Sequence, residues 1–376
     1  VQEMRLYMKR HDILAETIPF GTLGILALES SKEMGKRVND YIVDWREDRA
    51  KRHTAASGFA GYNRNSFLID SDCPRFGSGE AKGLIHESVR GDDLYLLVDV
   101  CNYSLTYKVC GQINHMSPDD HFQDVKRIIS AIGGKAKKIT VIMPFLYESR
   151  QHRRAARESL DCAMGLQELY NMGVENVIAL RGDSLVGEKR FTPTPGGFTH
   201  ADELVRMIKE GGKEGTDFCV GVGAYPEKHF EAPNLETDIL NLKRKVDQGA
   251  DFIITQMFFD NDKLYYFMDK LENAGIKATV HAGIMPITNA SQVSRMVDLS
   301  NAYIPRKLLS LCDKFRDSPE AMWQAGIAYA TDQIIDLISN GVRGIHIYTM
   351  NKPKVARAIM QNIDSIVAAT NGVIGA

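Results

Sequence analysis

The chain has 376 residues, 44% of them hydrophobic and 25% charged, which is enough apolar material for two ordinary domains or one large α/β barrel with additions. Its 46 basic and 48 acidic residues nearly balance, so no charge asymmetry indicates a nucleic-acid or membrane partner. No window approaches the ~20 apolar residues of a membrane span and no secretory leader is evident, so we expect a cytoplasmic protein that acts on small molecules.

Short apolar runs alternate with amphipathic stretches of helical length, which is the pattern of parallel βα units. Nine runs are predicted strands, in chain order TLGILALE near Ile25, SFLIDSD near Leu68, DLYLLVDV near Leu96, KITVIMPF near Val141, NVIALRGD near Ile178, FCVGVGAYPE near Val220, FIITQMFFD near Ile254, ATVHAGIMPI near Ala282 and GIHIYTMN near Ile347. The predicted crossover helices are PDDHFQDVKRIISAI, ESLDCAMGLQELYNMG, HADELVRMIKEGG, LETDILNLKRKVDQGA and SPEAMWQAGIAYATDQIIDLISNG. Residues 46–65 and 184–198 are polar or rich in Gly and Pro and are predicted surface loops.

The six cysteines include no C-x-x-C pair and lie in apolar segments. We therefore expect buried, reduced thiols rather than disulfides or a metal site. They are Cys73, Cys101, Cys110, Cys162, Cys219 and Cys312.

Polar residues follow several predicted strands, and in parallel α/β folds ligands gather at those strand ends. Arg181, Gly182 and Asp183 follow the fifth run, although such a triplet alone is more typical of a solvated turn. The sixth run leads into a loop that carries Tyr225, Glu227 and His229.

The next predicted helix repeats polar residues at steps of three and four, which places them on one face. They are Asp238, Asn241, Arg244 and Lys245. Such a face is usually solvated, but Gln256 follows in an otherwise apolar strand, and a buried amide without a partner costs ~1–3 kcal/mol. A ligand is one partner that it could have.

The ordered segments ALRGD, AYPEKH, DFIITQMFFD, GIMPITN and HIYTMN closely resemble methylenetetrahydrofolate reductase, from about Asn176 to Pro353. The resemblance implies later strands of a (β/α)8 barrel that hold FAD, with NAD(P)H as reductant and a folate as substrate. Implied FAD contacts are Arg181, Gly182, Asp183, Ala201, Tyr225, His229, Asp238, Asn241, Arg244 and Lys245. Implied catalytic residues are Asp183 and Gln256, and implied substrate contacts are Gln256, Gln292 and Lys352.

The sequence also departs from this family. Lys352 stands where arginine is common, and His200 stands where an aromatic residue is usual. The first three barrel strands, with their "F-E-x-x-P-P"-like segment and its general-acid glutamate, have no match upstream of Asn176. Glu29 is the upstream carboxylate in a roughly analogous place, but we expect it to begin a helix.

Residues of about 19–174 resemble a different family, the N-terminal domain of ribose-phosphate pyrophosphokinase. The resemblance rests on PRFGSGE, SVRGDDLYLLVDV, KKITVIMPFLYESRQHRR and the helix through LDCAMGLQEL. It implies ATP, with Mg, held by Phe76, Ser78 and Glu80 of one subunit and by Arg150 and Gln151 of a neighbour. The family's metal-binding histidine and its "D-x-x-x-x-T-G-G-T"-like loop are absent, so kinase chemistry is not expected.

The sequence therefore predicts an α/β hybrid. Residues 1–174 form a doubly wound parallel sheet, and residues 175–376 form a partial (β/α)8 barrel that shares the strand near Ile178. Three functions remain open: a flavin-dependent reductase, an incomplete ATP-binding module, and a chimera without catalysis. The open edges of an incomplete barrel favour a homo-oligomer, and no metal site is expected in either part.

Overall fold

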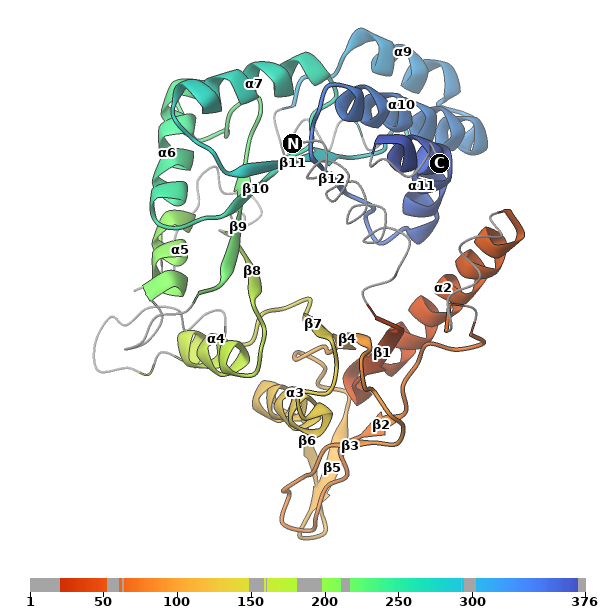
Figure 1. Cartoon of the computed structure of the whole chain (residues 1–376), viewed down its shortest axis with the longest axis vertical. Helices are drawn as coiled ribbons and strands as arrows, with labels where there is room; N and C mark the ends of the chain where they lie inside the picture. The colour runs from red at the N-terminus through yellow and green to blue at the C-terminus, as the bar shows by residue number, and fades with distance from the viewer. Residues whose placement is uncertain are drawn as a thin grey trace, which may run out of the picture. The chain divides into compact units, whose positions relative to one another are not determined.

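The computed structural model describes residues 21–52, 61–62, 64–148, 159, 161–180, 198–210, 217–291, 293 and 302–370 (Figure 1). The chain divides into two compact units, Val1–Glu175 and Asn176–Ala376. Both contain parallel β-sheet and helices, so the chain has a mixed α/β fold. Each unit is described by itself.

The first unit is built on a parallel sheet in the order β1 (Leu23–Ala27), β4 (Asp93–Leu97) and β7 (Lys138–Ile142). Ile25 is paired with Tyr95, and Tyr95 with Thr140. On the other side of β1, Ile25 forms an isolated parallel bridge with Leu68. The predicted second strand is therefore present only as this bridge and the short β2 (Ser71–Asp72), which pairs with β3 (Leu84–Ile85).

Two long helices cover opposite faces of this sheet. Ile25 and Leu97 pack with Val38 and Ile42 of α2 (Lys32–Arg52). The alternate residues Leu26, Leu94 and Leu96 pack with Val125, Ile128 and Ile129 of α3 (Pro118–Ile132). Because successive strand residues point to opposite faces, the two clusters form two separate hydrophobic layers.

Local signals explain the limits of α3. Ser117 and Asp120 form a capping box, Pro118 occupies the first turn, and Gly133 ends the helix with φ 61°. The following helix is α4 (Asp161–Asn171). Glu29 begins the short 3₁₀ helix η1 (Glu29–Ser31), as expected for a helix-starting glutamate.

Two sequence expectations for this unit were wrong. The helix α2 continues to Arg52, so residues 46–52 are helical rather than a loop. A hairpin of β5 (Thr106–Val109) and β6 (Gln112–His115) also lies where no strand was predicted, turning at Cys110 and Gly111 with φ 49° and 84°. That pair of positive φ values is typical of a two-residue hairpin turn.

The described residues of the second unit form a sheet of five parallel strands in the order β12-β11-β10-β9-β8. They are β8 (Asn176–Ala179), β9 (Cys219–Ala224), β10 (Phe252–Thr255), β11 (Thr279–Ile284) and β12 (Gly344–Ile347). The helices described in this unit are α5 (Ala201–Glu210), α6 (Leu235–Asp247), α7 (Asn261–Asn273), α9 (Arg306–Phe315), α10 (Pro319–Ser339) and α11 (Pro353–Thr370) (Figure 1). Consecutive strands are neighbours throughout, so right-handed crossovers place their helices on one face. Among the described strands β8 pairs with β9 and is not shared with the first unit's sheet, contrary to expectation.

The two faces of this five-stranded sheet differ in composition. One face is mostly aliphatic, and its buried members include Val220, Val222, Ile253, Ala282 and Ile284. On the other face, glycines lie next to rings from neighbouring strands: Gly221 next to Phe252, Gly283 next to Tyr348, and Gly344 next to His281. On the second face, aromatic and imidazole rings therefore lie directly against the backbone of the neighbouring glycines.

The cysteines are free thiols, as expected, but not all of them are buried. Cys162 and Cys312 are buried, whereas Cys101 and Cys110 are exposed. Cys101 lies in a turn after β4 and Cys110 lies in the turn of the β5–β6 hairpin, and neither turn was predicted from the sequence. No described helix is long and apolar enough to span a bilayer.

Candidate functional site

Polar and aromatic side chains meet at the carboxyl ends of β9, β10 and β12. Tyr225 follows β9, Gln256 follows β10, and Tyr348 follows β12. Burial raises the pKa of Tyr348 to about 12, and the nearby Tyr225 adds to this effect. Tyr348 therefore remains a hydrogen-bond donor at neutral pH, and its hydroxyl donates to the Thr255 carbonyl at 2.9 Å.

The loop from β9 to α6 is held by its own side chains. The ring of His229 lies edge-on to Tyr225 at 4.6 Å and stacks on Phe230 at 4.4 Å. The Glu231 backbone N–H donates to His229 Nδ1 at 3.1 Å, so this nitrogen carries no proton. Asp238 Oδ2 accepts the His229 backbone N–H at 2.8 Å, which joins the loop to the first turn of α6.

Lys228 has φ 116°, a backbone conformation that non-glycine residues rarely adopt. Its Nζ donates to the Ala232 carbonyl at 2.8 Å, and this bond helps to hold the turn. Strained residues of this kind persist where the surroundings fix them, often at binding sites.

The polar face predicted on α6 is real, but its members do different things. Lys245 Nζ donates to the Gly223 carbonyl on β9 at 2.9 Å, and Asp238 holds the loop. Arg244 is exposed, and its Nη1 is 3.4 Å from Asn241 Oδ1. Two of the four residues thus support the backbone, and Arg244 is the more exposed of the two cations.

Gln256 is half-buried and its backbone is fixed. Its N–H donates to the Ala224 carbonyl at 2.6 Å, and its side-chain Oε1 accepts the Met257 N–H at 3.0 Å. The carboxamide oxygen is therefore engaged within the protein, which leaves the amide nitrogen as the group suited to a ligand.

Glu227 joins neighbouring loops, which the sequence did not predict. Its Oε2 accepts the Tyr303 backbone N–H at 3.0 Å, while its buried Oε1 has no hydrogen-bond partner. Lys263, at the start of α7, lies 5.5 Å from the centre of the Tyr303 ring. Burial raises the pKa of Glu227, and the Tyr303 bond opposes that shift.

The remaining predicted residues of this unit are apart from this cluster or cannot be placed. Ala201 is buried at the first position of α5. Lys352 is exposed and follows Met350 and Asn351, whose φ values are 51° and 57°. Arg181, Gly182, Asp183 and Gln292 lie outside the described residues.

In the first unit, the predicted ATP residues Phe76, Ser78 and Glu80 share one turn. The Phe76 N–H donates to the Glu80 carbonyl at 2.7 Å, and Ser78 Oγ donates to Glu80 Oε2 at 2.9 Å. The Phe76 side chain is 52% exposed. Beside this turn, Arg75 is anchored to Asp124 at 2.8 Å, so the turn starts from a fixed point. Arg150 and Gln151 lie outside the described residues.

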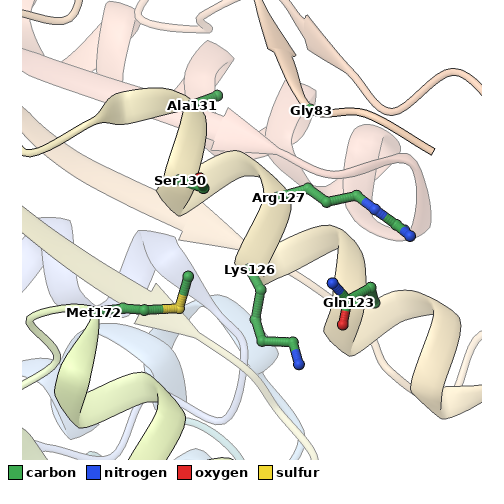
Figure 2. A pocket seen from close by; sticks show the side chains of 7 residues that line it. All are labelled: Gly83, Gln123, Lys126, Arg127, Ser130, Ala131 and Met172. Carbon is green, nitrogen blue, oxygen red and sulfur yellow. The ribbon is translucent and has the colours of Figure 1, made fainter.

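A shallow hollow of about 390 Å³ lies along α3 in the same unit (Figure 2). Its two cations are already paired, Lys126 with Glu168 at 2.8 Å and Arg127 with Asp124 at 2.6 Å. None of the predicted site residues lines it. Among the residues that the structure describes, no group of three His, Cys, Asp or Glu side chains could hold a metal ion.

The family model of methylenetetrahydrofolate reductase matches residues 152–364, more than half of the chain. The chain belongs to the methylenetetrahydrofolate reductase family. A second model, the N-terminal domain of ribose phosphate pyrophosphokinase, matches residues 23–173. The chain is therefore a hybrid, and the two matches overlap at residues 152–173, the segment that contains α4.

Curated members of the methylenetetrahydrofolate reductase family match about half of the chain. Methylenetetrahydrofolate reductase (NADH) 1 of Arabidopsis thaliana is 36% identical over 218 residues, 56% of this chain and 36% of that protein. The 5,10-methylenetetrahydrofolate reductase of Escherichia coli is 36% identical over 197 residues, 52% of this chain and 63% of that protein. The chain thus spans about a third of the plant reductase and less than two thirds of the bacterial one.

A solved structure, an uncharacterized Clostridium thermocellum protein that binds two copies of 5-methyl-5,6,7,8-tetrahydrofolic acid, matches with 12% identity and a TM-score of 0.37. The match covers 95% of this chain and 98% of the Clostridium thermocellum protein. The TM-score is too low to establish a shared fold.

Proposed function

We propose that the second unit is a flavoprotein oxidoreductase of the methylenetetrahydrofolate reductase type. The carrying observation is that Tyr225, His229 and Gln256 gather at the ends of adjacent parallel strands in a chain of this family. The sequential order β8 to β12 supports the proposal that these strands are the later part of a (β/α)8 barrel within residues 175–376.

The residues present fit an FAD molecule. The exposed Arg244 guanidinium suits its diphosphate, and the rings of Tyr225 and His229 suit a flat partner. We propose that Asp238, Asn241 and Lys245 act mainly by holding this surface, and that Ala201 packs beneath it. Arg181, Gly182 and Asp183 complete the proposed contacts, with Asp183 as a fixed negative charge beside the ring.

When bound, FAD would carry a hydride from NAD(P)H to 5,10-methylenetetrahydrofolate. The proposed contacts for folate or nicotinamide are Gln292, Lys352 and the side-chain amide nitrogen of Gln256. The family's general-acid segment has no counterpart upstream of Asn176. We therefore expect NAD(P)H to reduce the flavin while folate reduction is slow or absent.

The first test is the visible absorption of the purified protein. The chain is loaded with FAD, freed of unbound cofactor, and mixed anaerobically with NADH or NADPH. A retained flavin spectrum that bleaches supports the proposal, and addition of 5,10-methylenetetrahydrofolate then shows whether the flavin is reoxidised. A colourless protein contradicts it. The variant Arg244→Ala should bind FAD more weakly. The control is Lys243→Ala, at the residue before Arg244, which removes a cation that is paired with Asp247 and should leave FAD affinity unchanged.

For the first unit, residues 1–174, we propose a doubly wound sheet that binds ATP without pyrophosphokinase activity. The specific support is the exposed Phe76 ring on a turn closed by hydrogen bonds, in a segment that matches the pyrophosphokinase domain. Phe76→Ala should abolish an ATP-dependent rise in melting temperature, and an equal rise in the variant would contradict the proposal. We also propose a cytoplasmic homo-oligomer, in which Arg150 and Gln151 of a neighbour reach this turn.

A further inference from the structure

We infer that Tyr348 is a positioning residue for Gln256 and acts through the main-chain carbonyl of Thr255. The inference rests on the proposed function, in which Gln256 contacts the substrate. It adds a residue directly after β12 that sets the geometry of a side chain directly after β10.

The carbonyl of Thr255 needs an unusual partner because of where the sheet ends. The paired register of β10 with β11 stops at Ile254 and His281. The next N–H of β11 at this level, that of Gly283, donates to Thr255 Oγ1 at 2.8 Å. Thr255 is fully buried, so its carbonyl must be satisfied within the protein, and Tyr348 Oη donates to it at 2.9 Å.

That phenol bond fixes one side of the peptide group that leads into Gln256. The other side of the same peptide, the Gln256 N–H, donates to the Ala224 carbonyl of β9 at 2.6 Å. The plane of the peptide is therefore held from β12 and from β9. The Gln256 side chain begins at this fixed point, and its Oε1 is bound by Met257, so its Nε2 has a defined direction.

Gly283 makes this arrangement possible. A Cβ at this position would collide with the Thr255 carbonyl oxygen and would lie 2.8 Å from Tyr348 Cε2. The Tyr348 backbone is also fixed, because its N–H donates to the Ile284 carbonyl at 2.9 Å. The phenol thus reaches Thr255 across the end of β11 in a space that only glycine leaves open.

The chemical consequence concerns a ligand that offers a hydrogen-bond acceptor to Gln256. Nε2 can donate but cannot accept, so the site would favour a carbonyl oxygen or an unprotonated ring nitrogen, such as those of a reduced pterin. A carboxamide that is allowed to turn loses this preference, since its oxygen and nitrogen ends then compete for the same position. Tyr348 therefore contributes to ligand affinity without touching the ligand through its hydroxyl.

The test compares Tyr348→Phe with Tyr329→Phe. Tyr329 is a matched control, because its hydroxyl also donates to a main-chain carbonyl in the same unit, that of Phe259 at 2.7 Å. The first readout is the side-chain amide NMR signal of Gln256 in protein without cofactor, labelled at glutamine and assigned with Gln256→Glu. This signal should shift in Tyr348→Phe and stay in place in Tyr329→Phe.

The second readout is affinity for 5-methyltetrahydrofolate, titrated into FAD-loaded protein and followed by flavin absorbance. Tyr348→Phe should weaken binding about tenfold, the effect of losing the hydrogen bond from Gln256 to the ligand. Tyr329→Phe should change the affinity less than about twofold. In a Gln256→Ala background, Tyr348→Phe should have no further effect.

An unshifted Gln256 signal in Tyr348→Phe, equal effects of the two tyrosine variants, or additive losses in the double variant would overturn the inference. Wild-type protein that binds no flavin or folate would refute the proposed function instead. In that case the NMR comparison, which needs no cofactor, still decides whether Tyr348 positions Gln256.

Discussion

Gly326 shows how a single residue can reverse a general rule about helices. In the interior of a helix, replacing glycine by alanine normally adds about 1 kcal/mol of stability. Gly326 is buried in α10, and a Cβ there would collide with the carbonyl oxygen of Ile287. Because the obstacle is backbone and cannot turn aside, we expect Gly326→Ala to lower the free energy of unfolding by about 1–3 kcal/mol.

Urea unfolding followed by circular dichroism measures this loss. Ala328→Gly, at an exposed position two residues along the same helix, provides the control and should cost about 1 kcal/mol through propensity alone. A Gly326→Ala protein as stable as wild type would mean that α10 does not approach Ile287 so closely.

At the same scale, sequence reasoning found the residues near strand ends but not their contacts. Tyr225, His229 and Gln256 could be named because polar residues after apolar runs mark the ligand side of a parallel sheet. The bonds from Tyr303 to Glu227 and from Tyr348 to Thr255 join residues 76 and 93 positions apart. No local pattern encodes such pairs, because they depend on which strands become neighbours.

Elements were predictable where their signals are local and strong. Residues 117–133 carry a capping box, a proline at the first turn and a terminal glycine, and α3 has the predicted limits. The polar end of α2 was mistaken for a loop because Arg46–Arg52 has few apolar residues to show a helical period. The β5–β6 hairpin was not predicted because its strands are only four residues long, β6 is exposed throughout, and only Tyr107 and Val109 of β5 are half-buried.

The pair β11–β12 makes a prediction about pH. Burial, and secondarily the nearby His281, lower the pKa of His346. The folded-state pKa therefore lies below that of an unfolded histidine, about 6.5. The stability linked to His346 is full above pH ~6.5 and falls as the pH drops below it, because the unfolded chain then binds the proton more readily.

We expect the urea midpoint of the wild-type protein to decrease when the pH is lowered from 7.5 to 5.5. The urea midpoint of His346→Gln should decrease less over the same pH range. His281→Gln removes the second cause and should also reduce the dependence, by less than His346→Gln does. A pH dependence unchanged in His346→Gln would show that other groups account for it.

At the scale of the whole molecule, the chain combines two families at a junction where the helix α4, Gly173 and the short strand β8 follow one another. The matched regions overlap at residues 152–173, and the two compact units meet immediately afterwards, between Glu175 and Asn176. The resemblance identified both halves from their motifs. It left open whether they act independently, because cooperativity depends on contacts between units, and composition and periodicity do not report those.

The two tryptophans allow that question to be answered in the intact chain. Trp45 lies in α2 of the first unit and Trp323 in α10 of the second, so Trp323→Phe and Trp45→Phe each leave one fluorescent reporter. If the units unfold separately, the two variants should show different urea midpoints, each agreeing with one step of a circular dichroism curve of the unmodified chain. FAD at about 100 times its Kd should stabilise only the unit reported by Trp323, by about 2.7 kcal/mol, because the proposed flavin site lies in the second unit. Coincident unfolding curves whose urea midpoints both increase with FAD would instead establish a single cooperative unit. Urea midpoints that do not change with FAD would count against the proposed flavin site.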